Sequence, residues 1–547
     1  MTTCSHASRP NILVVLADDV GIGDLRPYSH SAPVSLPAIE YLAAEGTRFD
    51  EAHAWPLCAP SRYSLLSGNM AVRANRGSPG WDVFDLRTAF AAGQQSIAGL
   101  LRTNGYNTAF FGKWGIAAST AHAGGRLSRT ETMQTLFSKT RRLDMGPSDF
   151  GFNYSFASSA GIMDAPYAFF ENGELVGESC HWSVGAHRFA DGGVSVTGAG
   201  HHAEHEPRPV DQEEATPNGV LSWRSDQFDA IALNRALEFL DRHASANAVR
   251  RKGGRRPFFV EFATAAVHIP HTPPLRIAGT QIANRTLSAY NDMLLVLDFV
   301  INALLGALRR QGVLHDSLVV FLSDNGAIPC SEKRFGSLYS ADRTAAACAH
   351  SSVGRDTRGF KGGAFEGGHH VPMIMMLQGT QCTRGIGRGA VDPNLVAIED
   401  VFRTLLDFVG VAQLPGQGLD SVSFAAQLGA GRRGVAGRTR QVHAVEGTCT
   451  IGGAKRRHVW SVRVVRTKFL VANGTVIGVF DLKNNRSEAE ERNLLGAPES
   501  LRRVLHETTE LQTACGMAPP CSGLLPPLVG PRLARLCEVI CRTASTA

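Results

Sequence analysis

The sequence predicts an α/β fold in which a doubly wound, mostly parallel sheet is flanked by helices and followed by a smaller C-terminal antiparallel sheet. Continuous apolar runs of strand length are the first observation, because strands buried on both faces of a parallel sheet show no polar alternation. Segments with apolar residues at i, i+3 and i+4 lie between these runs and end near glycine, as amphipathic helices do. Short alternating runs near the C-terminus are the third observation, and they predict antiparallel strands.

The predicted strands and helices alternate along the chain. The apolar runs NILVVL, NTAFFGK, PFFVEFA and SLVVFLS begin at residues 11, 107, 257 and 317. The helical segments QSIAGLLRTNG and NDMLLVLDFVINALLGALRRQG begin at residues 95 and 291. Strands connected through helices lie parallel in one sheet, so these runs predict its centre.

The length of 547 residues exceeds what one compact core usually holds, so we predict two units. The first is the α/β domain over residues 1–425. The second is a subdomain over residues 426–547, in which the runs QVHAVEG, VWSVRVVRTKFLVANG and VIGVFDL predict strands and a helix follows near residues 500–511. The glycine- and arginine-rich stretch GAGRRGVAGR lies between the two units.

Composition excludes several classes of partner. The formal net charge of +6 is small for this length, and the arginines are scattered, so we do not expect nucleic acid to bind. The chain has no run of about 18 apolar residues, so we expect no integral membrane segment. The first ten residues lack the apolar core of a secretory signal, and we expect a secretory, lysosomal or other extracytoplasmic location only if a leader precedes this chain.

Polar side chains follow the predicted parallel strands at the points where the strands end. Asp18 and Asp19 follow the first run, Lys113 ends the second, His268 follows the third, and Asp324 and Asn325 follow the fourth. An isolated Asp-Asp or Asp-Asn after a strand is more often a helix cap or a turn. Because four strands carry polar residues to the same edge, where α/β sheets bind ligands, we favour a functional site.

The predicted site combines oxygen ligands with cationic side chains. Carboxylate and amide oxygens suit a hard cation, Ca²⁺ or Mg²⁺, better than zinc, and they come from Asp18, Asp19, Asp324 and Asn325. The cationic or proton-bearing side chains are Arg62, Lys113, His268 and Lys361. A divalent cation surrounded by such groups fits a tetrahedral oxyanion, phosphate or sulfate, whose charge must be held while an ester bond breaks.

Cys58 precedes a short predicted helix in which Pro60 is expected as the first helical residue. The free backbone N–H groups at such a helix start attract anions, so the thiol would lie where the oxyanion binds. The alternative interpretation is that Cys58 is a small buried hydrophobic residue, as most free cysteines are.

The stretch Cys58-Ala59-Pro60-Ser61-Arg62 matches the C-x-P-S-R signature of the sulfatase family, the formylglycine-dependent, arylsulfatase-type branch of the alkaline phosphatase superfamily. Three further stretches, LADDVGIGDL, FLSDNGA and FKGGAFEGG, resemble the metal-binding and lysine-bearing motifs of this family. The stretch VFDLKNNRSEAEERNLL resembles its C-terminal sheet, so the resemblance extends over nearly the whole chain.

The resemblance implies that the chain hydrolyses a sulfate monoester of a small molecule or glycan. It implies that a formylglycine-generating enzyme converts Cys58 to formylglycine, whose hydrate is the nucleophile. The implied ligands of one divalent cation, expected to be Ca²⁺ with Mg²⁺ as the alternative, are Asp18, Asp19, Asp324, Asn325 and the modified Cys58. The same resemblance implies catalytic roles for Arg62, Lys113, His268 and Lys361, with Lys361 or His268 protonating the leaving oxygen.

Two departures from the family pattern leave other functions open. Gly115 stands where the family has a histidine that contacts the formylglycine hydroxyls, and His370 stands where an arginine is usual. Loss of a positioned acid or base costs about 10²- to 10⁴-fold in rate, so a catalytically impaired binding protein is one alternative. A formylglycine-dependent phosphodiesterase or phosphonate monoester hydrolase is the other.

Overall fold

The computed structural model describes the following residues: 9–74, 88–116, 142–162, 168–176, 185–188, 194–197, 224–250, 254–269, 271–328, 357–379, 386–428, 442–451, 454–464, 467–473 and 475–482. The helix expected near residues 500–511 lies outside these ranges. The structural statements below concern the described residues.

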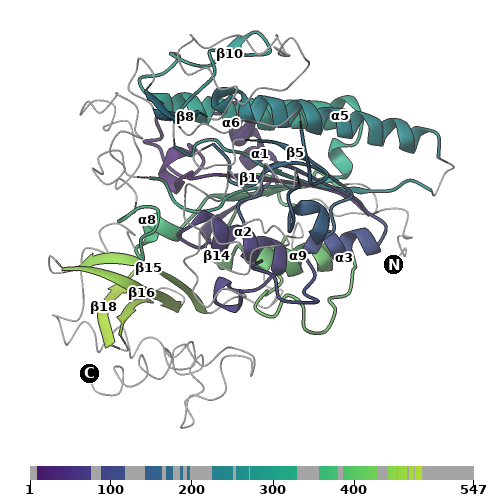
Figure 1. Ribbon diagram of the computed structural model, residues 1–547. Helices are drawn as coiled ribbons and strands as arrows, with labels where there is room; N and C mark the ends of the chain where they lie inside the picture. The colour runs from purple at the N-terminus through teal and green to yellow at the C-terminus, as the bar shows by residue number, and fades with distance from the viewer. Residues whose placement is uncertain are drawn as a thin grey trace.

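A ten-stranded sheet forms the centre of the protein, with the strand order β14-β2-β13-β12-β1-β9-β3-β4-β5-β6 (Figure 1). The central strands are β12 (Ser317–Ser323), β1 (Asn11–Ala17), β9 (Phe258–Ala263), β3 (Asn107–Lys113) and β4 (Tyr154–Ser158), and neighbouring members of this set pair in parallel. Four of these five strands are the predicted apolar runs, so the expected parallel centre is confirmed.

The outer strands of this sheet are mixed in direction. They are β2 (Thr47–His53), β13 (Met373–Met376), β14 (Ala390–Ala397), β5 (Phe170–Glu171) and β6 (Glu174–Leu175). Strand β13 runs antiparallel to both β12 and β2, whereas β14 pairs with β2 in parallel. The short strands β5 and β6 extend the opposite edge in antiparallel fashion.

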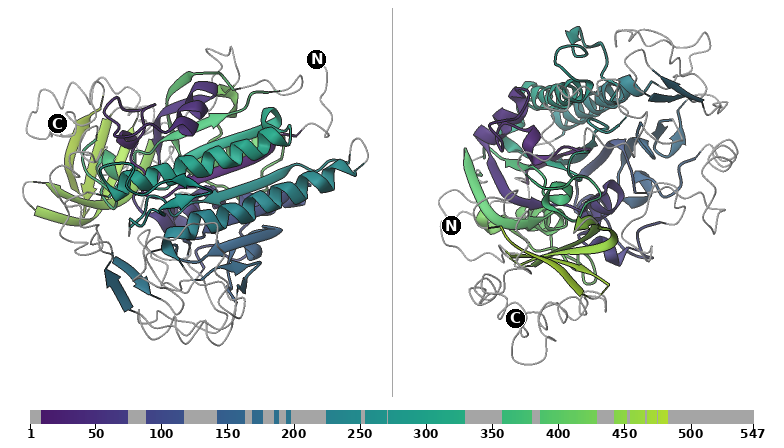
Figure 2. Two further views of the ribbon diagram at one scale, coloured as in Figure 1. Left: turned by 90° about the horizontal axis from the view of Figure 1, so that it is seen from above. Right: turned by 90° about the vertical axis from the view of Figure 1, so that its left-hand side faces the viewer.

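Helices cover both faces of the sheet, as expected of a doubly wound fold (Figures 1 and 2). One layer holds α1 (Pro37–Glu45), α5 (Phe228–Ala248) and α6 (Ala289–Arg310), and the other holds α2 (Cys58–Ser67), α3 (Ile97–Thr103) and α9 (Asp400–Phe408). Strand β1 shows why its run is wholly apolar: Val14 packs in the core with α2, and Val15 packs in the core with α5 and α6.

Short elements complete the described chain. The two small hairpins are β7 (Gly185–Arg188) with β8 (Val194–Thr197), and β10 (Arg276–Ile277) with β11 (Thr280–Gln281). The 3-10 helices are Ile22–Asp24, Ala71–Arg73, Pro147–Phe150, Ser225–Gln227, Leu314–Asp316 and Ala425–Gln427. A one-turn helix, α8 (Glu366–His369), lies beside the C-terminal strands (Figure 1).

The C-terminal strands form a separate four-stranded antiparallel sheet, as the alternating runs predict. Its strands are β15 (Val442–Ile451), β16 (Ala454–Val464), β17 (Thr467–Ala472) and β18 (Thr475–Asp481), joined in sequence order. This small sheet lies at one end of the large sheet, next to α8 (Figures 1 and 2).

Among the described helices, α6 alone has the length and apolar composition of a helix that could cross a membrane. Within its most apolar window, 67% of the helix is buried inside the protein. Its side chains pack against α1, α5 and the sheet, which is the usual environment of a helix in a protein core.

Candidate active site

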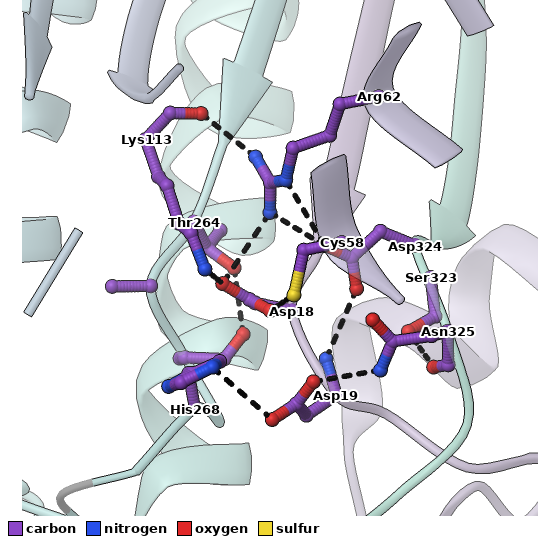
Figure 3. A network of polar contacts seen from close by, with 12 residues as sticks. Asp18, Asp19, Cys58, Arg62, Lys113, Thr264, His268, Ser323, Asp324 and Asn325 are labelled. Atoms are coloured by element: carbon purple, nitrogen blue, oxygen red, sulfur yellow. Dashed lines mark hydrogen bonds and ion pairs between the residues drawn. The ribbon is translucent and has the colours of Figure 1, made fainter. Parts of the chain in front are cut away.

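The carboxyl ends of four parallel strands converge on one group of polar side chains (Figure 3). Asp18 follows β1, Lys113 ends β3, His268 lies five residues after β9, and Asp324 follows β12. Because β12, β1, β9 and β3 are neighbours and parallel, these four side chains meet at one edge. The structure brings together all nine residues singled out from the sequence: Asp18, Asp19, Cys58, Arg62, Lys113, His268, Asp324, Asn325 and Lys361.

Arg62 and Lys113 surround the carboxylate of Asp18. Arg62 donates from Nε and Nη2 to Oδ2 of Asp324, at 3.0 and 2.8 Å, and its Nη2 lies 3.3 Å from Oδ2 of Asp18. Nζ of Lys113 donates to the same Asp18 oxygen at 2.5 Å. Burial alone would raise the pKa of Asp18, but the charges of Lys113, His268 and Arg62 outweigh it and lower the pKa well below its ordinary value.

Asp19 lies on the other side of the site, where Asn325 and Lys361 contact it. Nδ2 of Asn325 and Nζ of Lys361 donate to Oδ1 of Asp19 at 2.7 and 2.5 Å. The backbone of Asp19 has φ of +67°, a left-handed conformation that aspartate tolerates better than most residues and that often marks functional sites. This conformation turns the chain directly after β1.

His268 faces Asp19 through one ring nitrogen. Nδ1 of His268 lies 2.7 Å from the carbonyl oxygen of Ile269, so the proton is assigned to Nδ1, which donates. Nε2 is then the unprotonated nitrogen, and it lies 3.6 Å from Oδ2 of Asp19. Burial and the charges of Lys361 and Lys113 lower the pKa of His268 well below its ordinary value.

Cys58 lies between the acidic and cationic groups. Its Sγ is 3.3 Å from Oδ1 of Asp18 and 3.2 Å from Nζ of Lys361. The helix α2 begins at Cys58 itself, so Pro60 is its third residue and not its first as expected. The difference arises because Leu57 has an extended backbone and its carbonyl accepts the N–H of Ser61, which starts the helix two residues earlier.

The oxygen atoms of this site fit a hard divalent cation. Oδ2 of Asp19 and Oδ1 of Asn325 are buried, and neither has a hydrogen-bond partner in the described chain. Buried polar atoms normally have a partner, so these two oxygens beside other carboxylates are suited to bind a cation. Ligand atoms of Asp18, Asp19, Cys58 and His268 also lie within 4.8 Å of one another.

Gly115 lies beside the site in a conformation that disfavours other residues. Its φ is +67°, and a Cβ added there would lie 2.8 Å from Cδ of Arg62. Its N–H donates to the carbonyl of Ser159, which fixes the turn after β3. The glycine therefore leaves room for the buried guanidinium of Arg62. The second departure, His370, donates from Nε2 to the carbonyl of Asp50 at 2.8 Å, away from this site.

Sequence reasoning missed Asp229, which fixes the loop that carries His268. Its two carboxylate oxygens accept the backbone N–H groups of Ala265 and Ala266 at 2.9 and 3.0 Å. Burial raises the pKa of Asp229 to about 7, although these two hydrogen bonds oppose the shift. An aspartate in the first turn of α5 looks like an ordinary helix-start residue in the sequence, so no local signal identifies it.

Comparison with known proteins connects this site to one family. Residues 10–411 match the family described as Sulfatase. Among curated proteins, an N-acetylgalactosamine-6-O-sulfatase of Bacteroides thetaiotaomicron is 28% identical over 386 residues, covering 68% of this chain and 68% of that protein. The chain spans about two thirds of the length of the curated relatives it matches.

Solved structures share the fold at low sequence identity. A Bacteroides thetaiotaomicron structure from work on the metabolism of multiple glycosaminoglycans has a TM-score of 0.63 at 21% identity, covering 92% of this chain and 100% of that chain. The phosphonate monoester hydrolase of Agrobacterium radiobacter has a TM-score of 0.54 at 17% identity, covering 92% and 95%. The fold is therefore similar to enzymes named for different ester substrates.

Proposed function

Because the chain belongs to the sulfatase family, we propose that it hydrolyses a sulfate monoester through a formylglycine derived from Cys58. The observation that carries this proposal is the place of Cys58. Its Sγ lies at the start of α2, within 3.3 Å of both an acidic group, Asp18, and a cationic group, Lys361. The sulfur stands here for the formylglycine hydroxyl that would attack the sulfate.

The proposed cation ligands are the oxygens of Asp18, Asp19, Asp324 and Asn325, together with the modified side chain at position 58. All four of these residues are buried, and the donor set is the one that Ca²⁺ prefers, with Mg²⁺ as the alternative. When bound, the cation would lower the pKa of the formylglycine hydroxyl and offset the charge of the sulfate.

The cationic side chains would hold the sulfate while its ester bond breaks. Nζ of Lys113 donates to Asp18, and Nζ of Lys361 donates to Asp19. Arg62 holds Asp324 and the carbonyl of Lys113, so its proposed role is to keep the nucleophile and Lys113 in place. Lys361, which contacts Sγ directly, is the favoured candidate to give the departing oxygen its proton. His268, the other candidate, would first have to take up a proton at Nε2, and its lowered pKa opposes this.

The names of the relatives support the proposed substrate class. The Bacteroides relative is named an N-acetylgalactosamine-6-O-sulfatase, and a structural neighbour comes from work on glycosaminoglycan metabolism. A sulfated glycan is therefore the proposed natural substrate, and a formylglycine-generating enzyme is the proposed maturation partner.

Turnover of two chromogenic esters and the mass of one peptide test this proposal. We expect the matured protein to hydrolyse 4-nitrophenyl sulfate faster than an aryl phosphodiester or phosphonate ester of the same phenol. The tryptic peptide that contains Cys58 should have the mass of formylglycine and should react with a hydrazide. Faster phosphonate cleavage would favour the phosphonate hydrolase alternative, and full activity with an unmodified thiol would exclude the formylglycine mechanism.

A further inference from the structure

The segment that carries Lys361 is held between the large sheet and the small sheet. On the large-sheet side, the N–H groups of Lys361 and Gly362 donate to the carbonyls of Ala327 and Pro56, at 3.0 and 2.7 Å. Ala327 follows the Asp324–Asn325 turn, and Pro56 precedes Cys58 by two residues. The backbone of this segment therefore contacts both loops that build the proposed site.

The next residues of the segment pack into the small sheet. Ala364 and Phe365 lie in an apolar cluster with residues of β16, β17 and β18, separate from the two cores of the large sheet. Gly447 of β15 approaches Gly363 so closely that an added Cβ would lie 2.8 Å from its carbonyl carbon. Only a few residues therefore separate Lys361 from the contacts with the small sheet.

Buried charges complete the contact with the small sheet. Nη1 of Arg463, on β16, donates to Oε2 of Glu366 at 3.1 Å, and Nζ of Lys468, on β17, donates to Oε1 at 3.1 Å. All three side chains are at most 3% exposed. Arg463 also pairs with Glu51 of β2 at 2.5 Å, so two acidic and two basic side chains meet in this cluster.

Two histidines extend this buried cluster toward the loop of Cys58. Nε2 of His53 accepts from Nη1 of Arg463 at 2.9 Å, and its Nδ1 lies 3.0 Å from Nδ1 of His369. The carbonyl of His369 accepts the N–H of Ala54, and the carbonyl of Gly368 accepts the N–H of Gly326. Helix α8 is thus hydrogen-bonded to the chain just before Cys58 and just after Asn325.

We propose that Lys468 and Arg463 of the small sheet are positioning residues for Lys361. By holding Glu366, these two side chains fix the segment that places Lys361 beside Cys58. Neither Lys468 nor Arg463 lies in the candidate site itself. The proposal rests on the proposed function, since it assigns a role to the small sheet in the same reaction. The small sheet then contributes to binding and turnover, and not only to the stability of the fold.

A double-mutant cycle on the matured full chain tests this proposal with 4-nitrophenyl sulfate. We expect Lys468→Met to lower kcat/KM about 10-fold, which is within the range of couplings between residues linked through a shared backbone shift. In a Lys361→Ala background the same change should cost less than 2-fold, because the group it positions is already absent. Lys468→Arg should restore most of the activity, since it keeps the buried charge near Glu366.

Folding and binding controls separate positioning from a general loss of structure. Removing one partner of a buried ion pair costs about 3–5 kcal/mol, so Glu366→Gln/Lys468→Met, which removes both charges, replaces Lys468→Met if that variant does not fold. His458→Gln is the matched control, because His458 lies on β16 but pairs with Glu446 at the exposed surface. We expect this control to keep wild-type kcat/KM.

The affinity for inorganic sulfate, measured by calorimetry, is the readout that does not need turnover. Weaker sulfate binding in Lys468→Met, together with no further loss in the Lys361→Ala background, supports the proposal. Equal losses in both backgrounds, or no loss in either, would overturn it while leaving the proposed function intact. A wild-type protein that neither binds sulfate nor cleaves its ester would overturn both.

Discussion

Arg62 is held by three partners in the candidate site. It is almost fully buried, and its three nitrogens contact Asp324, Asp18 and the carbonyl of Lys113. A buried guanidinium with so many fixed partners has little freedom to move, because each lost contact would leave a buried charge unpaired. Gly115 lies next to Arg62, and its lack of a side chain leaves room for the guanidinium.

Replacing Gly115 by histidine is expected to harm the protein, even though the family pattern has histidine there. A left-handed residue with a side chain costs about 1–3 kcal/mol, and the new Cβ would press on Cδ of Arg62. We expect Gly115→His to lower the free energy of unfolding and to lower kcat through displacement of Arg62. Urea unfolding and steady-state kinetics measure the two effects.

Gly105→Ala is the control for this prediction. Gly105 also has a positive φ, +92°, but nothing lies within 4 Å of an added Cβ, so this variant measures backbone strain alone. Gly115→Ala should lose more stability than Gly105→Ala. A folded Gly115→His enzyme with a higher kcat would show that Arg62 can yield and that the site lacks a proton-transfer group.

The sequence predicts which side chains meet in the candidate site, because short motifs carry them. Asp18, Asp324 and Lys113 directly follow or end apolar runs, so strand pattern and motif give the same location. The left-handed backbone at Gly115 and the room it leaves for Arg62 have no such signal. They depend on contacts between segments about 50 residues apart, which no local pattern encodes.

At the scale of elements, the loop after β9 depends on a helix that precedes it. Asp229 of α5 accepts the N–H groups of Ala265 and Ala266. The carbonyl of Ala266 in turn accepts the N–H of Asp18, and the carbonyl of Ala265 accepts the N–H of His268. One carboxylate thus fixes the backbone of two residues of the candidate site.

We expect Asp229→Ala to lower both stability and turnover. Two buried N–H groups would lose their acceptor, at a cost of about 1–3 kcal/mol each, and His268 would lose its fixed position. Turnover of 4-nitrophenyl sulfate should fall by about 10-fold or more. Unfolding experiments and kcat measurements on the same preparation check the two effects.

Asp298→Ala is the matched control for Asp229→Ala. Asp298 of α6 also accepts two backbone N–H groups, those of Ala38 and Ile39 at the start of α1, but these residues are not part of the candidate site. This variant should lose stability and keep the kcat of its folded fraction. Equal effects of the two variants on kcat would contradict the positioning role of Asp229.

Periodicity predicts four of the five central strands and the two helical segments, because each forms from one continuous amphipathic or apolar stretch. Ser96 and Ser288 also accept N–H groups at the starts of α3 and α6, as helix-capping serines do. The antiparallel insertion of β13 between β12 and β2 is not visible in the sequence. Strand order depends on long-range pairing, and MIMM reads only as a short apolar run.

At the scale of the whole molecule, the two sheets meet through buried charge and not through an apolar interface alone. Glu51 of β2 and Glu366 of α8 face Arg463 and Lys468 of the small sheet. The division of the chain at residue 425 stays a prediction. Sequence composition places the glycine-rich stretch near this point but gives no sign of the charge pairs that cross from one sheet to the other.

The same cluster predicts that the protein loses stability in acid. His53 and His369 must both be neutral, because Nε2 of His53 accepts from Arg463 and only one proton fits between the two Nδ1 atoms. Burial, despite the nearby Glu366, lowers the pKa of His53. Burial and the charge of Lys468 lower the pKa of His369. The native state therefore binds fewer protons than the unfolded chain below about pH 6.5. The free energy of unfolding decreases as the pH is lowered through this range.

Urea unfolding at pH 7.5 and 5.5 measures this effect. Each histidine should contribute up to about 1 kcal/mol to the loss between these values, since the unfolded chain gains protons that the native protein excludes. His369 also faces Ser461, Glu366 and His370. Because other buried acidic groups titrate as well, the comparison with His369→Gln isolates the contribution of His369 to the loss of stability. That variant should be less stable at pH 7.5 but should lose less stability on acidification.

The exposed His315 provides the control, His315→Gln, which should keep the full wild-type dependence of stability on pH. The same acid-induced loss in His369→Gln as in the wild-type protein would show that this cluster does not set the acid sensitivity.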